Sequence, residues 1–326
     1  MRAIVCPRWG GPEVLTLADR DAPALRPGTL RVAVRAAGVN YADALMVAGR
    51  YHENPALPFV PGFEVAGVVE AVAPDVAGWR PGDPVMGLLT EGGYAPLAVI
   101  PADQALPVPT GLGLDAAAGF AVTYGTAYGA LVWRARLRPG ETLLVFGAGG
   151  GVGLAAVAVG RALGAQVIAV AGGADRLAAA AAHGAGITID HRHEDVAARV
   201  ADATGGRGAD VVIDPVGGTA FETALRAIGW GGRLVVVGFA SGTPGQVSAG
   251  VALGRNIDVI GCYWGSYRTH EPARVRHAYD ELARWVASGR LHVAPPQTMP
   301  LAEAPAALRR LLAREVTGKL VLTMPA

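Results

Sequence analysis

One stretch of this chain decides its fold: Thr142-Leu143-Leu144-Val145-Phe146-Gly147-Ala148-Gly149-Gly150-Gly151-Val152-Gly153. An apolar, β-prone run enters a glycine cluster, and the alanine-rich run 154–163 leaves it. That order predicts a strand, a tight turn and a helix. Glycines at such a turn let the backbone approach a pyrophosphate, and the helix N-terminus supplies free N–H groups and the positive end of its dipole.

The glycine pattern departs from G-x-G-x-x-G at one position. Ala148 stands where the first glycine is usual, so the motif spacing falls on Ala148, Gly150 and Gly153, with Gly151 and Val152 before the last glycine. The alternative is a glycine-rich turn that binds nothing. A second apolar run at 166–170 completes a strand–helix–strand unit and favours a dinucleotide-binding turn.

The rest of the chain falls into three zones. Residues 1 to about 120 hold short β-like runs, such as 30–34, 64–69 and 94–100, separated by Pro and Gly, which predicts an irregular β domain with few helices. From about 121 to 262, the expected strands are 142–146, 166–171, 187–190, 210–213, 233–238 and 257–260, and the expected helices are 152–164, 174–183, 193–203 and 219–228. This alternation implies an α/β fold with a doubly wound parallel sheet. The last zone is expected to hold helices at 272–288 and 303–314 and a strand at 319–323.

Composition narrows the function classes. A chain of 326 residues can form two domains with real cores, and a net charge of +1 argues against nucleic acid or an acidic membrane as the main partner. The mean hydropathy of +0.34 is high, but the most apolar segment, 152–170, is interrupted by polar residues and glycine and predicts no membrane span.

The N-terminal residues predict no secretion signal. Cys6 and Cys262 are the two cysteines, so neither a disulfide framework nor a four-cysteine zinc site is expected, and a cytoplasmic location fits.

Lys319 is the single lysine, and Glu315 stands four residues before it. This excludes the short-chain dehydrogenases, which need a Tyr-x-x-x-Lys pair.

Four further segments carry a family pattern: Ala37-Gly38-Val39-Asn40-Tyr41-Ala42-Asp43, Leu57-Pro58-Phe59-Val60-Pro61-Gly62-Phe63-Glu64-Val65-Ala66-Gly67, Pro139-Gly140-Glu141-Thr142 and Thr317-Gly318-Lys319-Leu320-Val321-Leu322. With the glycine turn, they make the chain resemble the medium-chain dehydrogenase/reductase superfamily, in its zinc-free, zeta-crystallin-like quinone oxidoreductase branch. The resemblance implies a GroES-like domain over 1–121, a Rossmann domain over 122–262 and a return to the first domain over 263–326.

Zinc alcohol dehydrogenases of this superfamily place a cysteine where Asn40 stands and a histidine where Phe63 stands, and a third ligand is also missing here. Asn and Phe cannot replace thiolate and imidazole on Zn²⁺, so no metal site is expected. His191 and His193 are interpreted as a solvated loop pair. Without a Lewis acid, the favoured chemistry is hydride transfer to an already polarised quinone or α,β-unsaturated carbonyl.

The end of the second strand indicates the cofactor. Enzymes that use NAD place Asp or Glu there to bind the ribose 2′-OH, whereas this chain has Gly172 and Gly173, followed by Arg176. Arg176 stands where the resembled enzymes carry a phosphate-binding lysine, so NADPH is predicted. Asp175 is interpreted as a helix N-terminal carboxylate. Arg314 matches another family position near the phosphate, and its alternative role is a solvated arginine at a helix end.

The resemblance implies further cofactor contacts. Asn40, Tyr41 and Thr126 are expected near the nicotinamide, and His191 near the adenosine. Gly238, Phe239, Ala240 and Ser241 are expected at the nicotinamide, at the carboxyl edge of the sheet. The aromatic residues of segment 261–267 either line a planar substrate or pack between domains. Asn40 and Tyr51 are the candidates for a catalytic proton or hydrogen-bond donor.

Two alternatives to a quinone or enone reductase stay open. One is an enoyl-thioester or polyketide-type enone reductase, and the other is an NADPH-binding protein with little turnover.

The strand at 256–260 reads as the last of its sheet, with an open edge. The resemblance suggests that two copies pair there as a homodimer, and the alternative is an edge covered by the chain's own loop.

Overall fold

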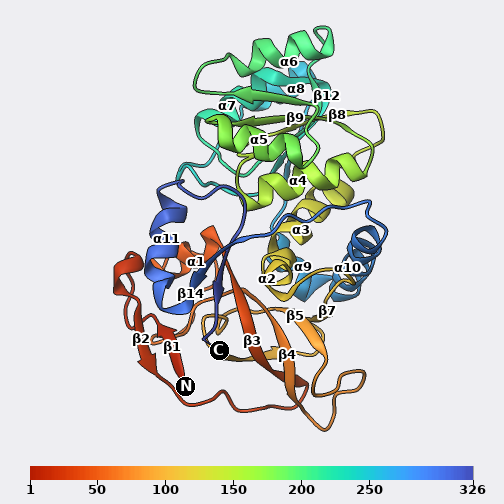
Figure 1. Ribbon diagram of the computed structural model, residues 1–326. Coiled ribbons are helices and arrows are strands. Elements are labelled where there is room, and N and C mark those ends of the chain that lie inside the picture. The colour runs from red at the N-terminus through yellow and green to blue at the C-terminus, as the bar shows by residue number, and fades with distance from the viewer. Residues whose placement is uncertain (326) are drawn as a thin grey trace. The chain divides into compact units, whose positions relative to one another are not determined.

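The computed structural model describes residues 1–325 and contains two compact units. Unit 1 consists of Met1–Val122 together with the chain from Val293 onward, and unit 2 consists of Thr123–His292. Figure 1 shows unit 1 in red to yellow with dark blue, and unit 2 from yellow through green to lighter blue. The chain therefore leaves unit 1, completes unit 2, and returns to add its last strands to the first sheet.

Unit 1 is built on strands. Its elements are β1 (Arg2–Val5), η1 (Pro12–Val14), β2 (Thr16–Asp19), β3 (Thr29–Val39), α1 (Tyr41–Val47), β4 (Glu64–Val72), β5 (Pro84–Leu88), β6 (Leu97–Pro101), β7 (Ala105–Pro107), α2 (Leu114–Ala118), β14 (Gln297–Pro300), η3 (Leu301–Glu303), α11 (Ala304–Leu312) and β15 (Leu320–Thr323). One sheet has the order β14-β15-β3-β4-β5-β7, with β6 paired to β3, and β1 and β2 form a separate antiparallel pair.

Strand β3 organises this sheet. Leu30, Val32 and Val34 are buried at every second position, as expected where one face of a strand packs on a core. β3 pairs with β4, β6 and β15, and its register to β4 shifts twice, which bends the strand. β3 ends at Val39, and α1 begins at Tyr41, so Asn40 is the N-cap residue of α1.

Unit 2 alternates strands and helices. Its elements are α3 (Phe120–Tyr128), which starts in unit 1, η2 (Gly129–Arg134), β8 (Thr142–Val145), α4 (Gly151–Ala162), β9 (Gln166–Ala171), α5 (Ala174–Ala182), β10 (Ile187–Asp190), α6 (Val196–Thr204), β11 (Ala209–Asp214), α7 (Thr219–Ala227), β12 (Ile228–Val236), α8 (Ala249–Arg255), β13 (Asp258–Gly261), α9 (Trp264–His270) and α10 (Pro272–Ala287). The strands are parallel in the order β10-β9-β8-β11-β12-β13, which confirms the predicted doubly wound sheet.

The helices of unit 2 cover both faces of this sheet. α4 and α5 contact each other and β9, whereas α6 and α7 contact each other. Val196, Val200, Phe221 and Ala224 of α6 and α7 share a core with the central strands. The strand order reverses between β8 and β11, and ligands of such sheets bind at the carboxyl ends of the strands beside that point.

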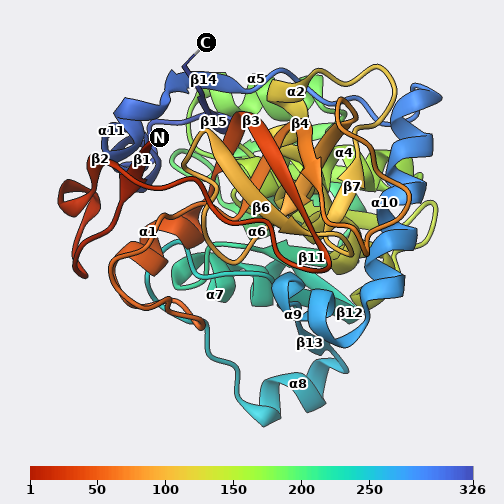
Figure 2. The ribbon, with the colours of Figure 1, turned by 90° about the horizontal axis from the view of Figure 1, so that it is seen from below.

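Several elements were not predicted because their local pattern is weak. α8 has no buried residue, so no apolar stripe marks it in the sequence. It projects from the body of unit 2 (Figure 2). β12 begins at Ile228, earlier than expected, because its register to β11 jumps between Ile228 and Arg233 and leaves Gly229 to Gly232 outside the ladder.

An aromatic cluster explains why the second unit boundary differs from the predicted one. Residues 263–292 were expected to return to the first domain, but they belong to unit 2. Trp264 is 5% exposed, stacks on Trp133 at 5.2 Å, and packs against Gly125 and Tyr279. For Trp264, the packing role is therefore the one observed, whereas Tyr263 beside it is exposed.

Candidate functional site

The glycine turn lies at the carboxyl end of β8. Gly147 has φ 58°, a conformation that favours glycine, and its carbonyl accepts a hydrogen bond from the Gly150 N–H at 3.0 Å. α4 then begins at Gly151 with Gly150 as its N-cap residue, and no side chain caps the helix. The N–H groups of its first turn, on Gly151, Val152 and Gly153, are thus available to an anion.

Two positions of the turn have structural roles. A Cβ at Gly153 would lie 2.2 Å from the Gly147 carbonyl oxygen, so only glycine lets α4 pack this closely on the turn. Ala148 is buried, and its N–H donates to the Val170 carbonyl at 3.0 Å. Its side chain fits because it points into the protein, which explains how alanine replaces the usual first glycine.

Arg176 lies against this turn. A Cβ at Gly149 would lie 2.5–2.7 Å from Cδ, Cβ and Cγ of Arg176, and the Arg176 Nη1 donates to the Gly172 carbonyl at 3.3 Å. Gly173 has φ 96° and caps α5, and Asp175 lies in the first turn of that helix. The structure thus brings the glycine turn, the tip of β9 and Arg176 together.

The loop after β10 completes one side of this site. The Asp190 carboxylate accepts hydrogen bonds from the N–H groups of Gly173 at 3.2 Å and Arg192 at 3.0 Å, and its Oδ2 lies 3.2 Å from Nδ1 of His193. The Arg192 hydrogen bond is the largest of the causes that hold the pKa of Asp190 below its usual value. The Nε2 of His191 lies 2.9 Å from the position that a Cβ of Gly172 would take.

The loops after β11 and β12 form the other side. Ala240 and Ser241 donate their N–H groups to the carbonyls of Pro215 and Val216, at 3.0 and 2.9 Å. A Cβ at Gly217 would meet Phe239 and Ser241, and one at Gly147 would meet Pro215 and Val216. The predicted segment Gly238 to Ser241 therefore lies beside the 215–218 loop, which in turn borders the glycine turn.

Asp214 is a residue of this edge that the sequence analysis missed. It is fully buried, and its Oδ1 accepts the N–H groups of Val216 at 2.7 Å and Gly217 at 3.0 Å. Within residues 1–325, its Oδ2 has no hydrogen-bond partner, and burial raises the pKa of this carboxyl. The sequence pattern that could have identified Asp214 is an aspartate followed by Pro-Val-Gly-Gly at the end of a strand.

Unit 1 contains a buried polar cluster around Asn40. The ammonium of Lys319 lies 2.7 Å from Oδ1 of Asn40 and 2.6 Å from Oε1 of Glu64. The Asn40 amide nitrogen donates to the same Glu64 oxygen at 3.0 Å and to the Gly38 carbonyl at 3.5 Å. Every polar atom of the Asn40 side chain thus has a protein partner, which fixes its orientation. Its predicted donation to a substrate stays a prediction.

Asp43 lies next to this cluster. Its Oδ2 accepts the Asn40 backbone N–H at 2.7 Å and the Tyr94 hydroxyl at 2.9 Å, and within the described chain its Oδ1 has no partner. Complete burial raises the pKa of Asp43 to about 7, against the lowering effect of these hydrogen bonds. Asp43 therefore holds the start of α1 in place from the protein interior.

The other predicted residues are distributed over both units. In unit 1, Tyr51 packs edge-on against Phe63, with ring centroids 5.1 Å apart, Tyr41 begins α1, and exposed Arg314 follows α11 with φ 59°. In unit 2, Thr126 is buried on α3. Asn40 is thus brought to Glu64 and Lys319, and Tyr51 to Phe63.

The family models match both parts of the chain. A model described as an alcohol dehydrogenase GroES-like domain matches residues 26–110, and one described as a zinc-binding dehydrogenase matches residues 151–288. The quinone oxidoreductase-like protein 2 homolog of Nematostella vectensis is 37% identical over 98% of this chain and 88% of its own length. The chain belongs to the medium-chain dehydrogenase/reductase superfamily, in its quinone oxidoreductase branch.

Solved structures agree with this membership. The Escherichia coli quinone oxidoreductase complexed with NADPH superposes with a TM-score of 0.91, at 30% identity over 99% of this chain and 100% of that one. The CurK enoyl reductase superposes with a TM-score of 0.88, at 26% identity over 99% of each chain. This medium-chain reductase is therefore an oxidoreductase of the NAD(P)-dependent type, with quinone and enone reductases among its neighbours.

One family model is described as a zinc-binding dehydrogenase, but at residue 40 this oxidoreductase has an amide side chain instead of a zinc-ligating thiolate. At Asn40, where zinc-dependent members of the superfamily have a thiolate, an amide is held between an ammonium and a carboxylate. Within residues 1–325, no three His, Cys, Asp or Glu side chains are grouped as metal ligands. Cys6 and Cys262 are buried free thiols.

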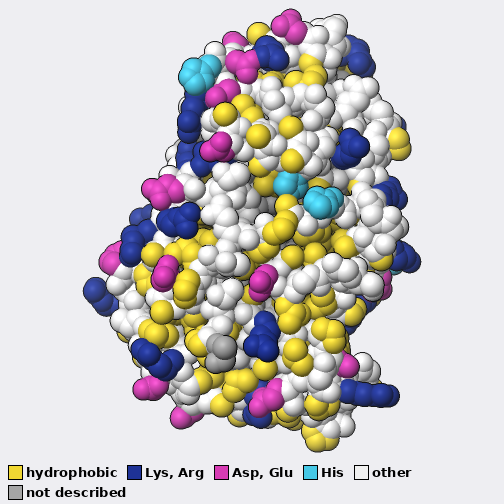
Figure 3. Space-filling view, in the orientation of Figure 1, with side chains coloured by type: hydrophobic (Ala, Val, Ile, Leu, Met, Phe, Trp, Pro, Cys, Tyr) yellow, Lys and Arg dark blue, Asp and Glu magenta, His cyan; other side chains and the backbone are white. Residues whose placement is uncertain are grey.

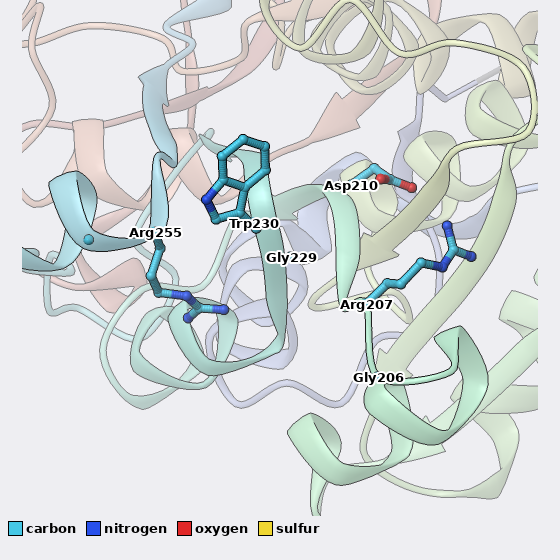
Figure 4. A pocket seen from close by; sticks show the side chains of 7 residues that line it. Gly206, Arg207, Asp210, Gly229, Trp230 and Arg255 are labelled. Atoms are coloured by element: carbon cyan, nitrogen blue, oxygen red, sulfur yellow. The ribbon is translucent and has the colours of Figure 1, made fainter.

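A hollow of unit 2 lies at the amino ends of β11, β12 and β13. It has a volume of about 480 Å³ and is lined by residues that precede or begin β11, β12 and β13, among them Arg207, Asp210, Trp230 and Arg255 (Figure 4). Asp210 accepts the Thr142 N–H, and Arg255 donates to the carbonyls of Leu225 and Ile228. These charged groups support the backbone, and the hollow lies at the opposite ends of the strands from the glycine turn.

On the face of the molecule that Figure 3 shows, basic and acidic side chains are interspersed. Among residues 1–325, no helix combines the length and apolar character that a bilayer crossing requires.

Proposed function

We propose that this oxidoreductase uses NADPH to reduce a quinone or an α,β-unsaturated carbonyl, without zinc. The observation that carries the cofactor choice is the tip of β9, where Gly172 and Gly173 replace the carboxylate expected for NAD and Arg176 lies across the adjacent glycine turn. The E. coli quinone oxidoreductase with bound NADPH supports the same choice.

The residues of unit 2 fit this cofactor. The uncapped N–H groups at the start of α4 would bind the pyrophosphate, because the close approach at Gly153 keeps the helix N-terminus at the turn. Arg176 would bind the ribose 2′-phosphate, and His191 would lie beside the adenosine. The 238–241 loop would border the nicotinamide. When bound, NADPH supplies a hydride to the acceptor.

The buried cluster of unit 1 would act on the acceptor side. Quinone reduction consumes one hydride and one proton, and water can supply the proton. Lys319 and Glu64 fix the Asn40 amide, and the Asp43 carboxyl holds its backbone, so this segment is preorganised before any ligand binds. Tyr51, whose ring packs on Phe63, is the candidate hydrogen-bond donor to an enone oxygen. Arg314 is kept as a candidate second contact to the phosphate.

Replacing Arg176 by alanine tests the cofactor assignment. Loss of a charge-assisted phosphate contact should weaken NADPH binding by about 1.5–3 kcal/mol, whereas NADH binding should change little. Titration calorimetry with each nicotinamide measures both affinities. Arg226→Ala is the matched control, because Arg226 is an exposed arginine at the end of α7. Equal losses for NADPH and NADH in the Arg176 variant would contradict the assignment.

A steady-state panel of acceptors distinguishes the substrate classes. Turnover of simple quinones, in the presence of a chelator, is the expected result for a zinc-free quinone reductase. The enoyl-thioester alternative is favoured by the likeness to the CurK enoyl reductase and predicts turnover of acyl-thioester enones alone. Tight NADPH binding without turnover of any acceptor would indicate the third alternative, an NADPH-binding protein with little turnover.

A cytoplasmic location of the protein stays a prediction.

A homodimer through the edge of the parallel sheet is part of the proposal. β13 is the last strand of its sheet, and Val259 on it is 39% exposed. On the preceding α8, Val251 is 40% exposed and Leu253 is 79% exposed. The Cys262 N–H donates to Val236 of β12, so by alternation the Val259 N–H faces away from β12. Arg134 covers the Gly261 carbonyl at the end of this edge.

Proline at Val259 tests this arrangement. It removes an outward N–H without breaking the ladder to β12, so it should weaken association while leaving unit 2 folded. Light scattering should give about twice the 33.2 kDa chain mass for the natural protein and for Val259→Thr, which keeps the donor. A monomer at micromolar concentration, or a dimer that tolerates the proline, would argue against pairing at this edge.

A further inference from the structure

Arg192, in the loop after β10, lies over the tip of β9. A Cβ at Gly172 would lie 2.6 Å from its Nε, and a Cβ at Gly173 would lie 3.4 Å from its Nη1. The loop holds this position through its backbone, because the Arg192 N–H donates to Asp190 Oδ1 and the Gly173 N–H donates to Asp190 Oδ2. One carboxylate thus connects the two segments, and the absence of side chains at Gly172 and Gly173 leaves space for the guanidinium.

The guanidinium of Arg192 differs from its neighbours in having no partner within residues 1–325. Arg176 donates to the Gly172 carbonyl and Arg199 pairs with Glu194, whereas no hydrogen bond or ion pair is formed by the Arg192 side chain. Its N–H fork is therefore available to an anion without breaking a bond in the protein.

Two arginines consequently converge on Gly172 from different segments. Arg176 reaches it from α5 through a hydrogen bond to its carbonyl, and Arg192 reaches it from the loop after β10. Like charges that approach one residue repel each other unless an anion lies between them. The negative groups nearby are Asp175, in the first turn of α5, Asp190, whose oxygens already accept the hydrogen bonds described above, and Glu194. The Glu194 carboxylate accepts the Asp190 N–H and pairs with Arg199.

We infer that Arg192 is a specificity-determining residue that binds the ribose 2′-phosphate of the cofactor together with Arg176. This assignment rests on the proposed NADPH dependence and adds to Arg176 a phosphate ligand from the loop of another strand. The phosphate dianion would be held between two guanidinium groups, and the 2′-hydroxyl of NADH would leave one of them unpaired. Discrimination between the two cofactors would thus exceed what Arg176 alone provides.

Binding of the adenosine half alone tests the inference without turnover. The probes are 2′,5′-ADP and 5′-AMP, which differ at the 2′-phosphate, titrated by calorimetry into the full-length natural protein and its Arg192→Gln variant. We expect the substitution to weaken 2′,5′-ADP roughly 10- to 100-fold and to change 5′-AMP by less than about twofold. Arg226→Gln, which removes the same charge from the end of α7, a helix that packs on β11 and β12, should leave both affinities unchanged.

The outcomes separate this inference from the proposed function. Natural protein that binds 2′,5′-ADP no tighter than 5′-AMP would overturn both. A clear preference that Arg176→Ala abolishes and Arg192→Gln preserves would leave the NADPH assignment intact and overturn the role of Arg192. Equal weakening by Arg192→Gln and Arg226→Gln would indicate a general charge effect, and equal weakening of both nucleotides would indicate a distorted loop; either result overturns the inference. Unchanged thermal stability of unliganded Arg192→Gln is expected, because the side chain has no partner to lose.

Discussion

Replacing Lys319 by methionine is expected to destabilise unit 1 by about 3–5 kcal/mol. Glu64 is fully buried, and its Oε1 accepts hydrogen bonds from Lys319 and Asn40, while its Oε2 accepts the Val122 N–H at 2.8 Å. Methionine removes the single cation of this arrangement and leaves the carboxylate buried without a counter-charge. Urea denaturation, followed by circular dichroism, measures the loss as a lower transition midpoint for unit 1.

Two variants define the cause of that loss. Arg31→Met breaks the partly exposed pair with Glu70 and should cost at most about 1 kcal/mol, as surface ion pairs do. The double variant Lys319→Met with Glu64→Gln removes both charges and should be more stable than Lys319→Met alone. If Lys319→Met costs no more than Arg31→Met, the buried pair has no structural role of the size argued here.

Replacing Gly153 by alanine is expected to abolish tight cofactor binding, although the change is a single methyl group. Its Cβ would lie 2.2 Å from the Gly147 oxygen and 2.8 Å from the Ala148 Cα. These are backbone atoms of the glycine turn, so the methyl group must push α4 away from β8. Such overpacking costs about 1–3 kcal/mol in stability, and it displaces the N–H groups that would bind the pyrophosphate.

Gly254 provides the matched control for this substitution. It also lies in a helix, α8, but a Cβ there would meet nothing within 4 Å. Gly254→Ala should therefore be neutral or slightly stabilising, since alanine favours the helix. NADPH titration and thermal denaturation of both variants make the comparison. Normal NADPH affinity in Gly153→Ala would contradict the role of this close approach in the cofactor site.

The candidate site in unit 2 was accessible to sequence reasoning because its parts are local. The glycine turn follows its strand directly, and Gly172, Gly173 and Arg176 lie within five residues of one another. Apolar runs marked β8, β9 and β11 closely because these strands are short and almost entirely buried, and the alternation of isoleucine with polar residues marked β10. Arg192 stands between two histidines in the sequence, and that order does not reveal its position over Gly172, which depends on the hydrogen bonds of Asp190.

The sequence by itself determined the doubly wound sheet, the family, the glycine turn and the absence of the zinc-ligand types at Asn40 and Phe63, because these depend on residue identity and short-range order. Only the tertiary structure decided the partners of Asn40, since Lys319 lies 279 residues away and joins it through the β15–β3 pairing. The same holds for the burial of Asp43 and the place of residues 263–292 in unit 2. Such contacts arise from packing between distant segments, and no local pattern encodes which distant side chain fills a given space.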